Sequence, residues 1–318
     1  IERRQEEAAP PSTGVKWTPA AIKAFGLVNV AAMLFGSNQV LIKMAETEVS
    51  PDVLNIARFG IAAIALLPLG LSSKIWKKPK LMWSALELGG YLFIGYTTQV
   101  LGLELTTASR GGVMMEFAVL VVPFLSRLSG KKIDKVVWWS AFAALVGVAM
   151  VTNSGDGGSF NLGDLLCILS ATCFGIHVFR SEDKVEGLQE GDIRGLVAAQ
   201  LAVLAVGSGI YGAGDYLLHN GMDFAAHPSA SLGSALNYLH DLPWLNLMFM
   251  GLGTTAFTIW IEITALKDIS STLAALIYTT EPLWGATFAA VILHENFGAL
   301  GYAGAALIVG STCFATLK

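Results

Sequence analysis

Charge is rare inside the long apolar stretches of this sequence, and four of the ionisable side chains there are candidates for chemistry: Glu116, His177, Glu262 and Glu281. On membrane-insertion scales a charged residue in hydrocarbon costs about 2.5–3.5 kcal/mol, and such residues usually face the interior of a helix bundle. A carboxyl group in such a place either holds a proton or faces a wet cavity with a partner nearby. Glu116, the deepest of the four, is therefore suited to carry protons or to bind a cationic or zwitterionic amine.

Polar uncharged residues accompany these groups at helical spacing. Thr258 precedes Glu262 by four residues, and Tyr278 precedes Glu281 by three. Asn38 and Gln39 interrupt the first apolar stretch, and Tyr96 and Gln99 share one helix face of the third. The predicted solute-binding residues are Asn38, Gln39, Tyr96, Gln99, Glu116, His177, Thr258, Glu262, Tyr278 and Glu281.

Each of these residues also has a purely structural interpretation. Small polar side chains let helix backbones approach, so the threonines before Glu262 can form a packing surface. Glu262 lies near a helix end and can reach water, and His177 can be a hydrogen-bonded interior residue. Arg58 is expected to pair with a nearby carboxylate or to extend its charge toward water. Glu116 lies deepest, and its structural alternative is a buried hydrogen bond that pins its helix to a neighbour.

Pro123 and Pro282 are the predicted hinge residues. A proline removes the hydrogen bond to the carbonyl four residues earlier, which frees the carbonyls of Val119 and Tyr278. Membrane transporters place substrates and hinges at broken helices. The alternative is that a membrane helix merely tolerates its proline.

The composition makes lipid the solvent for much of the chain. Of its 318 residues, 54% are hydrophobic and only 14% are charged, and the mean hydropathy is +0.60. Soluble domains carry about 25% charged residues. The three cysteines lie in apolar stretches without a metal or disulfide pattern, and no HExxH, GxSxG or intramembrane aspartate pair is present. We therefore expect no enzyme, no cofactor, no metal site and no nucleic-acid partner.

The sequence predicts an all-α integral membrane protein with ten transmembrane helices. A helix needs about 20 mostly apolar residues to cross the hydrocarbon, and ten stretches approach this length. They are Ile22–Met44, Val53–Gly70, Ser84–Leu105, Arg110–Leu128, Val136–Val151, Gly163–Phe179, Leu196–Tyr211, Trp244–Thr264, Ser271–Leu293 and Phe297–Phe314.

Basic residues predict the orientation of these helices. If ten helices alternate in direction, the side that holds both termini receives all of the 20 Lys and Arg residues except Lys43, Arg58 and Arg110. Loops on the cytoplasmic side of a membrane are enriched in Lys and Arg. We therefore expect the termini on the cytoplasmic side, or on the stromal side in a plastid.

An internal repeat is visible in the sequence. Leu103 aligned with Leu266 brings similar segments together at an offset of 163 residues, and Gly36 aligned with Gly175 gives an offset of 139. The difference is explained by an insertion at 212–242. We expect a polar tail at 1–21, a first five-helix repeat at 22–152 and a second at 161–316. Because each repeat has an odd number of helices, the two have opposite orientations, as in secondary transporters.

Several motifs resemble the EamA family of the drug/metabolite transporter superfamily. They are TTASRGG followed by VVPFL, then GDLLCILSATCFGIHV, and finally AALIYTTEP with a closing HEN. Gly130-Lys131 departs from the Gly-Glu that usually follows the fourth helix of the family. The resemblance implies a ten-helix fold and the export or exchange of small solutes. The last three helices contain no Lys or Arg away from their ends, which argues against a phosphorylated solute.

Two functions remain open at this stage. The first is a secondary transporter of a small metabolite that works by alternating access, with proton coupling as an option. The second is a non-transporting subunit of a larger membrane assembly, such as a plastid photosynthetic supercomplex. In that case the tail at 1–21 would contact another polypeptide. Independently of this choice, we expect the segment 212–242 to form an ordered cap on the face opposite the termini. The expected partners are a solute and lipid, together with other membrane subunits if the tail binds them.

Overall fold

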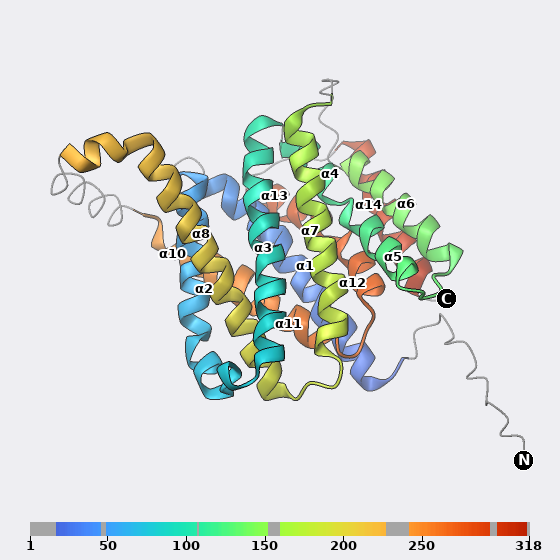
Figure 1. The fold of residues 1–318 in the computed structure, drawn as a ribbon. Coiled ribbons are helices and arrows are strands. Elements are labelled where there is room, and N and C mark those ends of the chain that lie inside the picture. The colour runs from blue at the N-terminus through green and yellow to red at the C-terminus, as the bar shows by residue number, and fades with distance from the viewer. Residues whose placement is uncertain are drawn as a thin grey trace, which may run out of the picture.

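The computed structural model describes residues 17–45, 49–106, 108–151, 160–226, 242–292 and 298–316, and these residues are mostly helical with no strand among them (Figure 1). Six of the described helices are long and apolar enough to cross a membrane. They cover Pro19–Ile42, Asp52–Ser73, Gly111–Leu128, Leu162–Val185, Glu190–Leu218 and Trp244–Ala265. Shorter apolar helices span Lys135–Val151 and Ala299–Ala315. The protein is an all-α integral membrane protein.

The helices of the first half follow one another with short connections. They are α1 (Pro19–Ala45), α2 (Pro51–Ser73), the short 3₁₀ helix η1 (Ile75–Lys77), α3 (Pro79–Leu105), α4 (Ala108–Met115), α5 (Ala118–Leu128) and α6 (Lys135–Val151). The second half contains α7 (Leu162–Val185), α8 (Glu190–Ala226), α10 (Trp244–Phe249), the π-helix η2 (Met250–Phe257), α11 (Thr258–Ala265), α12 (Ser271–Tyr278), α13 (Glu281–Ile292) and α14 (Ala299–Thr316).

Local sequence signals set several of these boundaries. Pro51 and Pro79 stand at the starts of α2 and α3, where the missing N–H has no partner to lose. Asn161 begins α7 through a capping box, in which its side chain accepts from the Asp164 N–H and the Asp164 carboxylate accepts from the Asn161 N–H. Ser270 caps α12 by accepting a hydrogen bond from the N–H of Leu273.

Each of the ten predicted stretches contains a described helix or a short series of helices, but three details differ from prediction. The fourth and ninth stretches are each split into two helices, α4/α5 and α12/α13. The eighth contains the π-helix η2 between α10 and α11.

The third difference corrects the predicted insertion at 212–242. Residues 212–226 continue α8 as a helix, although Gly212 and Asp215 favour a loop in the sequence. At the start of this continuation α8 approaches α2 closely, since a Cβ on Gly212 would lie 2.3 Å from Cδ1 of Ile56. The remainder of the predicted cap, 227–241, lies outside the described residues, as do residues 1–16 of the predicted tail.

Helix packing follows a two-fold pattern at the two offsets found in the sequence. The offsets relate α1 to α7, α2 to α8, α3 to α11, α4/α5 to α12/α13, and α6 to α14. In the structure α2 packs on α8 and α6 packs on α14, so two related pairs contact each other directly. The contact of α3 with α7 has its counterpart in α1 with α11, and α5 with α7 has its counterpart in α1 with α13. This pattern favours the predicted repeat of opposite orientation.

Two aligned glycines show the same relation at atomic detail. A Cβ on Gly36 of α1 would lie 2.7 Å from the Glu281 carbonyl oxygen and from the Trp284 Cβ of α13. A Cβ on Gly175 of α7 would lie 2.9 Å from the Val121 Cβ and 3.5 Å from the Ala118 carbonyl oxygen of α5. Residues 281 and 284 are 163 positions after 118 and 121, so each glycine meets the counterpart of the other's neighbours.

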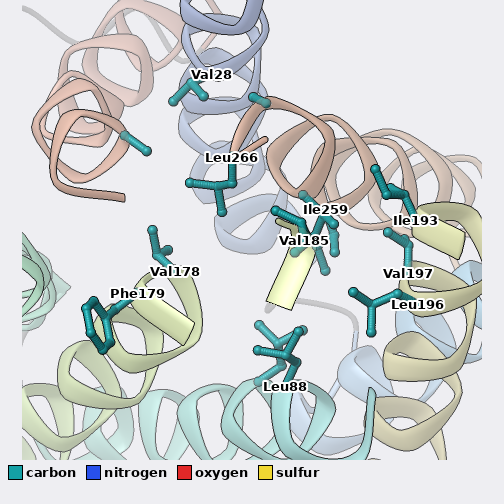
Figure 2. Close-up of a cluster of buried hydrophobic side chains, with 14 of the residues drawn as sticks. Val28, Leu88, Val178, Phe179, Val185, Ile193, Leu196, Val197, Ile259 and Leu266 are labelled. Atoms are coloured by element: carbon teal, nitrogen blue, oxygen red, sulfur yellow. The ribbon is translucent and has the colours of Figure 1, made fainter. Parts of the chain in front are cut away.

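The main hydrophobic core lies toward one end of the bundle (Figure 2). Val28 of α1, Leu88 of α3, Val178 of α7, Leu196 of α8 and Ile259 of α11 meet there and are buried. We call this end the basic end, because the connections beside it contain Lys78 and Lys131 and it also contains Arg180 and Lys184. A smaller apolar cluster, with Ala45, Val49, Leu54, Leu242, Leu247 and Met250 as its buried members, lies toward the opposite end.

Candidate functional site at the two helix breaks

Glu262 is the centre of a buried polar cluster. Its side chain in α11 is 5% exposed. The Tyr278 hydroxyl, on the last residue of α12, donates a hydrogen bond of 2.7 Å to Oε2 of Glu262. His177 of α7 places Nδ1 3.3 Å from Oε1 of Glu262, and this oxygen has no hydrogen-bond partner among the described residues. The cluster therefore joins three helices and leaves one carboxylate oxygen able to receive a proton or a donor.

His177 continues the cluster into α8. Its Nε2 lies 3.2 Å from Oε1 of the buried Gln200, whose amide nitrogen finds no hydrogen-bond partner in the described part of the chain. A chain of Tyr278, Glu262, His177 and Gln200 thus crosses the core. Buried polar groups in proteins nearly always have a hydrogen-bond partner. Two atoms of this series of side chains, Glu262 Oε1 and Gln200 Nε2, have none among the described residues, so the series can accept a ligand or a proton.

The two helix breaks lie 163 residues apart. Glu116 and Phe117 separate α4 from α5, and Thr279 and Thr280 separate α12 from α13. Glu281 begins α13. Its carboxyl group interacts electrostatically with that of Glu116. The breaks therefore bring two acidic side chains from the two halves of the chain near each other, although they are far apart in sequence.

Tyr96 of α3 connects these groups to the rest of the bundle. Its ring lies 4.9 Å, centroid to centroid, from Phe59 of α2 and also 4.9 Å from Phe174 of α7. Tyr96 interacts electrostatically with both Glu262 and Glu281. It therefore lies near these acidic side chains, and its part in solute binding stays a prediction.

The other predicted site residues form hydrogen bonds with groups outside this acidic cluster. Asn38 of α1 accepts a hydrogen bond of 2.8 Å from the Thr254 hydroxyl in η2, and the Thr258 hydroxyl donates to the Gly253 carbonyl at 2.9 Å. Gln99 of α3 places Nε2 2.7 Å from the sulfur of Met115, at the end of α4. The side chain of Gln39 lies outside the described residues.

Pro123 and Pro282 lie at different distances from the two helix breaks. Pro282 is the second residue of α13 and follows its break directly, whereas Pro123 lies inside α5, several residues after the break at Glu116. The first interruption is therefore placed by the residues around Glu116 rather than by the proline. Whether either position acts as a hinge stays a prediction.

Comparison with known proteins identifies the family of the chain. The model of the EamA-like transporter family matches residues 22–153 and 230–317, which is more than half of the chain. The chain belongs to the EamA-like transporter family. A protein of Archaeoglobus fulgidus named as an uncharacterized transporter is 33% identical over 150 residues, a match that covers 47% of this chain and 46% of that protein. The chain thus matches about half the length of this relative.

A solved crystal structure has the same fold. It superposes with a TM-score of 0.67 at 17% identity, and the alignment covers 93% of this chain and 97% of the other. At this level of identity the likeness shows the fold alone.

Three buried polar residues of the candidate site or its surroundings were not selected from the sequence. Gln200 and Thr254 are uncharged, and nothing in their spacing separates them from packing residues. Arg58 was expected to pair with a carboxylate or reach water, yet it is 3% exposed and lies within α2. Its charge inside an apolar stretch was the signal that could have placed it in the site.

The π-helix is a further feature that the sequence did not indicate. η2 contains Gly251, Gly253 and the paired Thr254 and Thr255, and it faces Asn38 through Thr254. Such π segments inside α-helices are frequent at functional sites. The EamA-family site is therefore built from two broken helices, one locally widened helix and a buried chain of polar side chains. These parts can bind a polar solute and exchange protons with it.

Proposed function

We propose that this EamA-family protein is a secondary transporter that moves a small polar metabolite by alternating access. The supporting observation is an asymmetry between related parts of the two repeats. α12 packs against α5 and α7, and α11 packs against α7. The counterparts of these contacts are α4 with α13, α4 with α1, and α3 with α1. Among the described residues none of these counterparts is a packed helix pair of similar extent.

This asymmetry is what one state of a two-state transporter should show. If two repeats of opposite orientation exchange conformations, the contacts that close one end in one state close the other end in the next. In the present state, the closing contacts lie toward the basic end. A second conformation, in which α4 packs against α1 and α13 while α12 separates from α5 and α7, would complete the cycle.

Proton exchange at Glu262 is the proposed coupling step. The carboxylate lies on α11, receives a hydrogen bond from α12 and faces His177 of α7, so it lies between helices that would separate when the basic end opens. A proton on Glu262 removes its negative charge and weakens its attraction for His177 and for a cationic solute. Release of that proton on the other side would make transport depend on a pH gradient.

Transport into proteoliposomes under an imposed pH gradient tests this function. Uptake of a panel of radiolabelled metabolites should identify at least one solute whose accumulation depends on the gradient. Glu262→Gln should remove the dependence while the protein still inserts and elutes as the wild type does. Glu190→Gln is the matched control, because that carboxylate is 83% exposed at the start of α8. Gradient-driven uptake that is unchanged in Glu262→Gln would contradict the coupling step, and absence of uptake for the whole panel would contradict the function.

A further inference from the structure

Arg58 is a buried cation on the inner side of α2. Its side chain belongs to the eighth residue of a helix that runs from Pro51 to Ser73, and only 3% of the residue is exposed. The backbone of η2 lies close to it, since a Cβ on Gly251 would be 2.9 Å from the Arg58 carbonyl oxygen. Arg58 therefore lies at the contact between α2 and η2 rather than at the surface of the bundle.

None of the described acidic side chains neutralises this cation. Among the described residues, Arg58 forms no ion pair, and its Nε has no hydrogen-bond partner. Buried charges in proteins are paired as a rule, because an unpaired charge in a low-dielectric interior is costly. The five N–H groups of a guanidinium form a planar fork that matches a carboxylate.

The neighbours of Arg58 orient it without satisfying it. The guanidinium carbon lies 4.4 Å from the centre of the Phe59 ring and 4.8 Å from the centre of the Tyr96 ring. Tyr96 interacts electrostatically with Arg58 and also with Glu262 and Glu281. Tyr96 thus contacts the cation directly and interacts electrostatically with two acidic groups, and the aromatic rings hold the guanidinium plane in place.

We propose that Arg58 binds the carboxylate group of the transported solute. This inference rests on the proposed function, because the buried guanidinium becomes accessible only when the bundle opens. The single cation suits a carboxylate, which carries one charge, better than a phosphate monoester, which carries nearly two. The acidic groups around Tyr96 then face the remainder of the solute, and an amine there would be bound more tightly than a second carboxylate.

Binding to the purified full-length chain in detergent tests this proposal without requiring transport. The probes are acids and their uncharged amides: alanine and alaninamide, phenylalanine and phenylalaninamide, succinate and succinamide, with sodium chloride as the simple anion. The midpoint of thermal unfolding should rise with at least one acid and should not rise with its amide. Equal shifts with acid and amide, a shift with chloride alone, or no shift with any acid would overturn the proposal.

Variants of Arg58 separate ligand binding from a structural role. Arg58→Met should abolish the shift caused by the acid and raise the unfolding midpoint of the unliganded protein, because it removes an unpaired buried charge. Arg58→Lys should weaken binding at least tenfold, since an ammonium lacks the planar fork. Arg194→Met, which removes a cation paired with Glu190 near the surface, should leave the shift unchanged. A lower midpoint for Arg58→Met together with an unchanged acid shift would show that Arg58 only packs against the rings.

The two proposals fail in different ways. A protein that binds acids through Arg58 but accumulates none of them in vesicles contradicts the transport function and keeps this inference. A protein that transports a solute equally well as wild type and as Arg58→Met contradicts this inference and keeps the transport function.

Discussion

The helices α4 and α12 occupy related positions in the two halves of the chain but differ in their surroundings. Residues 271–277 of α12 are all buried, whereas residues 112–115 of α4 are only half-buried. Both helices have eight residues, and each ends at a short interruption before the next helix, α5 or α13. Their difference therefore comes from the neighbours that cover them and not from their own length or position.

Polar contacts hold α12 in place at the basic end. Glu182 of α7 accepts hydrogen bonds from the N–H and the hydroxyl of Ser271, at 2.9 and 2.5 Å, and it also pairs with Lys131. The offset of 163 places Ala108 at the start of α4, where Ser271 stands in α12. An alanine cannot repeat the hydroxyl contact.

The two ends also differ in the chemistry beside these helices. At the basic end Glu87 of α3 pairs with Arg180 and Lys184 of α7, at 2.5 and 2.9 Å. The related positions at the opposite end are Met250, Leu41 and Ala45, which belong to the smaller apolar cluster. Exposed ion pairs contribute about 0–1 kcal/mol each and weaken with salt. The basic end is therefore held together partly by ion pairs, which pH and salt can change. The opposite end has mainly apolar surface to bury.

The aligned glycines provide the largest expected effect on stability. Gly36→Ala brings its Cβ against backbone atoms of α13, at 2.7 Å from the Glu281 oxygen and the Gly285 nitrogen, while Gly175→Ala meets the more adaptable Val121 side chain at 2.8 Å. Overpacking of this kind costs about 1–3 kcal/mol. We expect both variants to lower the midpoint of thermal unfolding, with Gly36→Ala the more damaging.

Gly26→Ala serves as the control for this pair, because a Cβ there meets nothing within 4 Å. Equal midpoints for Gly36→Ala and Gly26→Ala would contradict the close packing of α1 on α13.

The next largest expected effect comes from removing the contact of Glu182 with α12. Glu182→Ala removes two hydrogen bonds to Ser271 and an ion pair, which should shift the balance between the two ends by about 1–2 kcal/mol toward an open basic end. Thiol labelling of a cysteine introduced at Thr272, which is buried against Ser126, should become faster by about tenfold.

Asp183→Ala is the matched control for Glu182, since this neighbouring carboxylate is 44% exposed and contacts only Lys131 among the described ion-pair partners. If both variants accelerate labelling equally, a general loss of negative charge is the cause and the specific contact with α12 is not.

The smallest expected effect on stability comes from the side-chain contacts beside the two helix breaks, Tyr278 with Glu262 and Met115 with Gln99. Tyr278→Phe removes the hydrogen bond to the buried Glu262 and should lower the free energy of unfolding by about 1 kcal/mol. Met115→Leu removes the related contact with Gln99, and the cost should be smaller because a thioether sulfur is a weak acceptor. Equal losses of stability in chemical unfolding experiments would show that the two breaks are energetically alike.

The sequence predicted the helical framework well, because apolar length is a strong signal in a membrane protein. The offset of 163 also relates the two breaks in the structure, although the sequence placed the interruptions at Pro123 and Pro282. The extension of α8 to Ala226 and the π-helix η2 were missed, since Gly212 and Asp215 favour a loop and no sequence pattern marked the π-helix.

The charged members of the candidate site were selected from the sequence, and their role in solute binding stays a prediction. Glu262 and His177 were selected because charge is rare in these stretches, and the structure brings them together. The part played by Gln200 could not be inferred, because a glutamine at that spacing is as common in packing surfaces as in sites. Arg58 was assigned a carboxylate partner on general grounds, and only the structure showed that none of the described residues supplies one.

Distances across the two ends, measured in the same molecule, test alternating access most directly. Spin labels at Leu128 and Lys267 report on the basic end, and labels at the related positions Glu104 and Val291 report on the opposite end; all four residues are exposed. Cys167, Cys173 and Cys313 are first replaced by alanine or serine. Pulsed electron spin resonance should show that Glu182→Ala lengthens the first distance and shortens the second. If the two distances move in the same direction, or if only the first one changes, the ends are not coupled and the account is wrong.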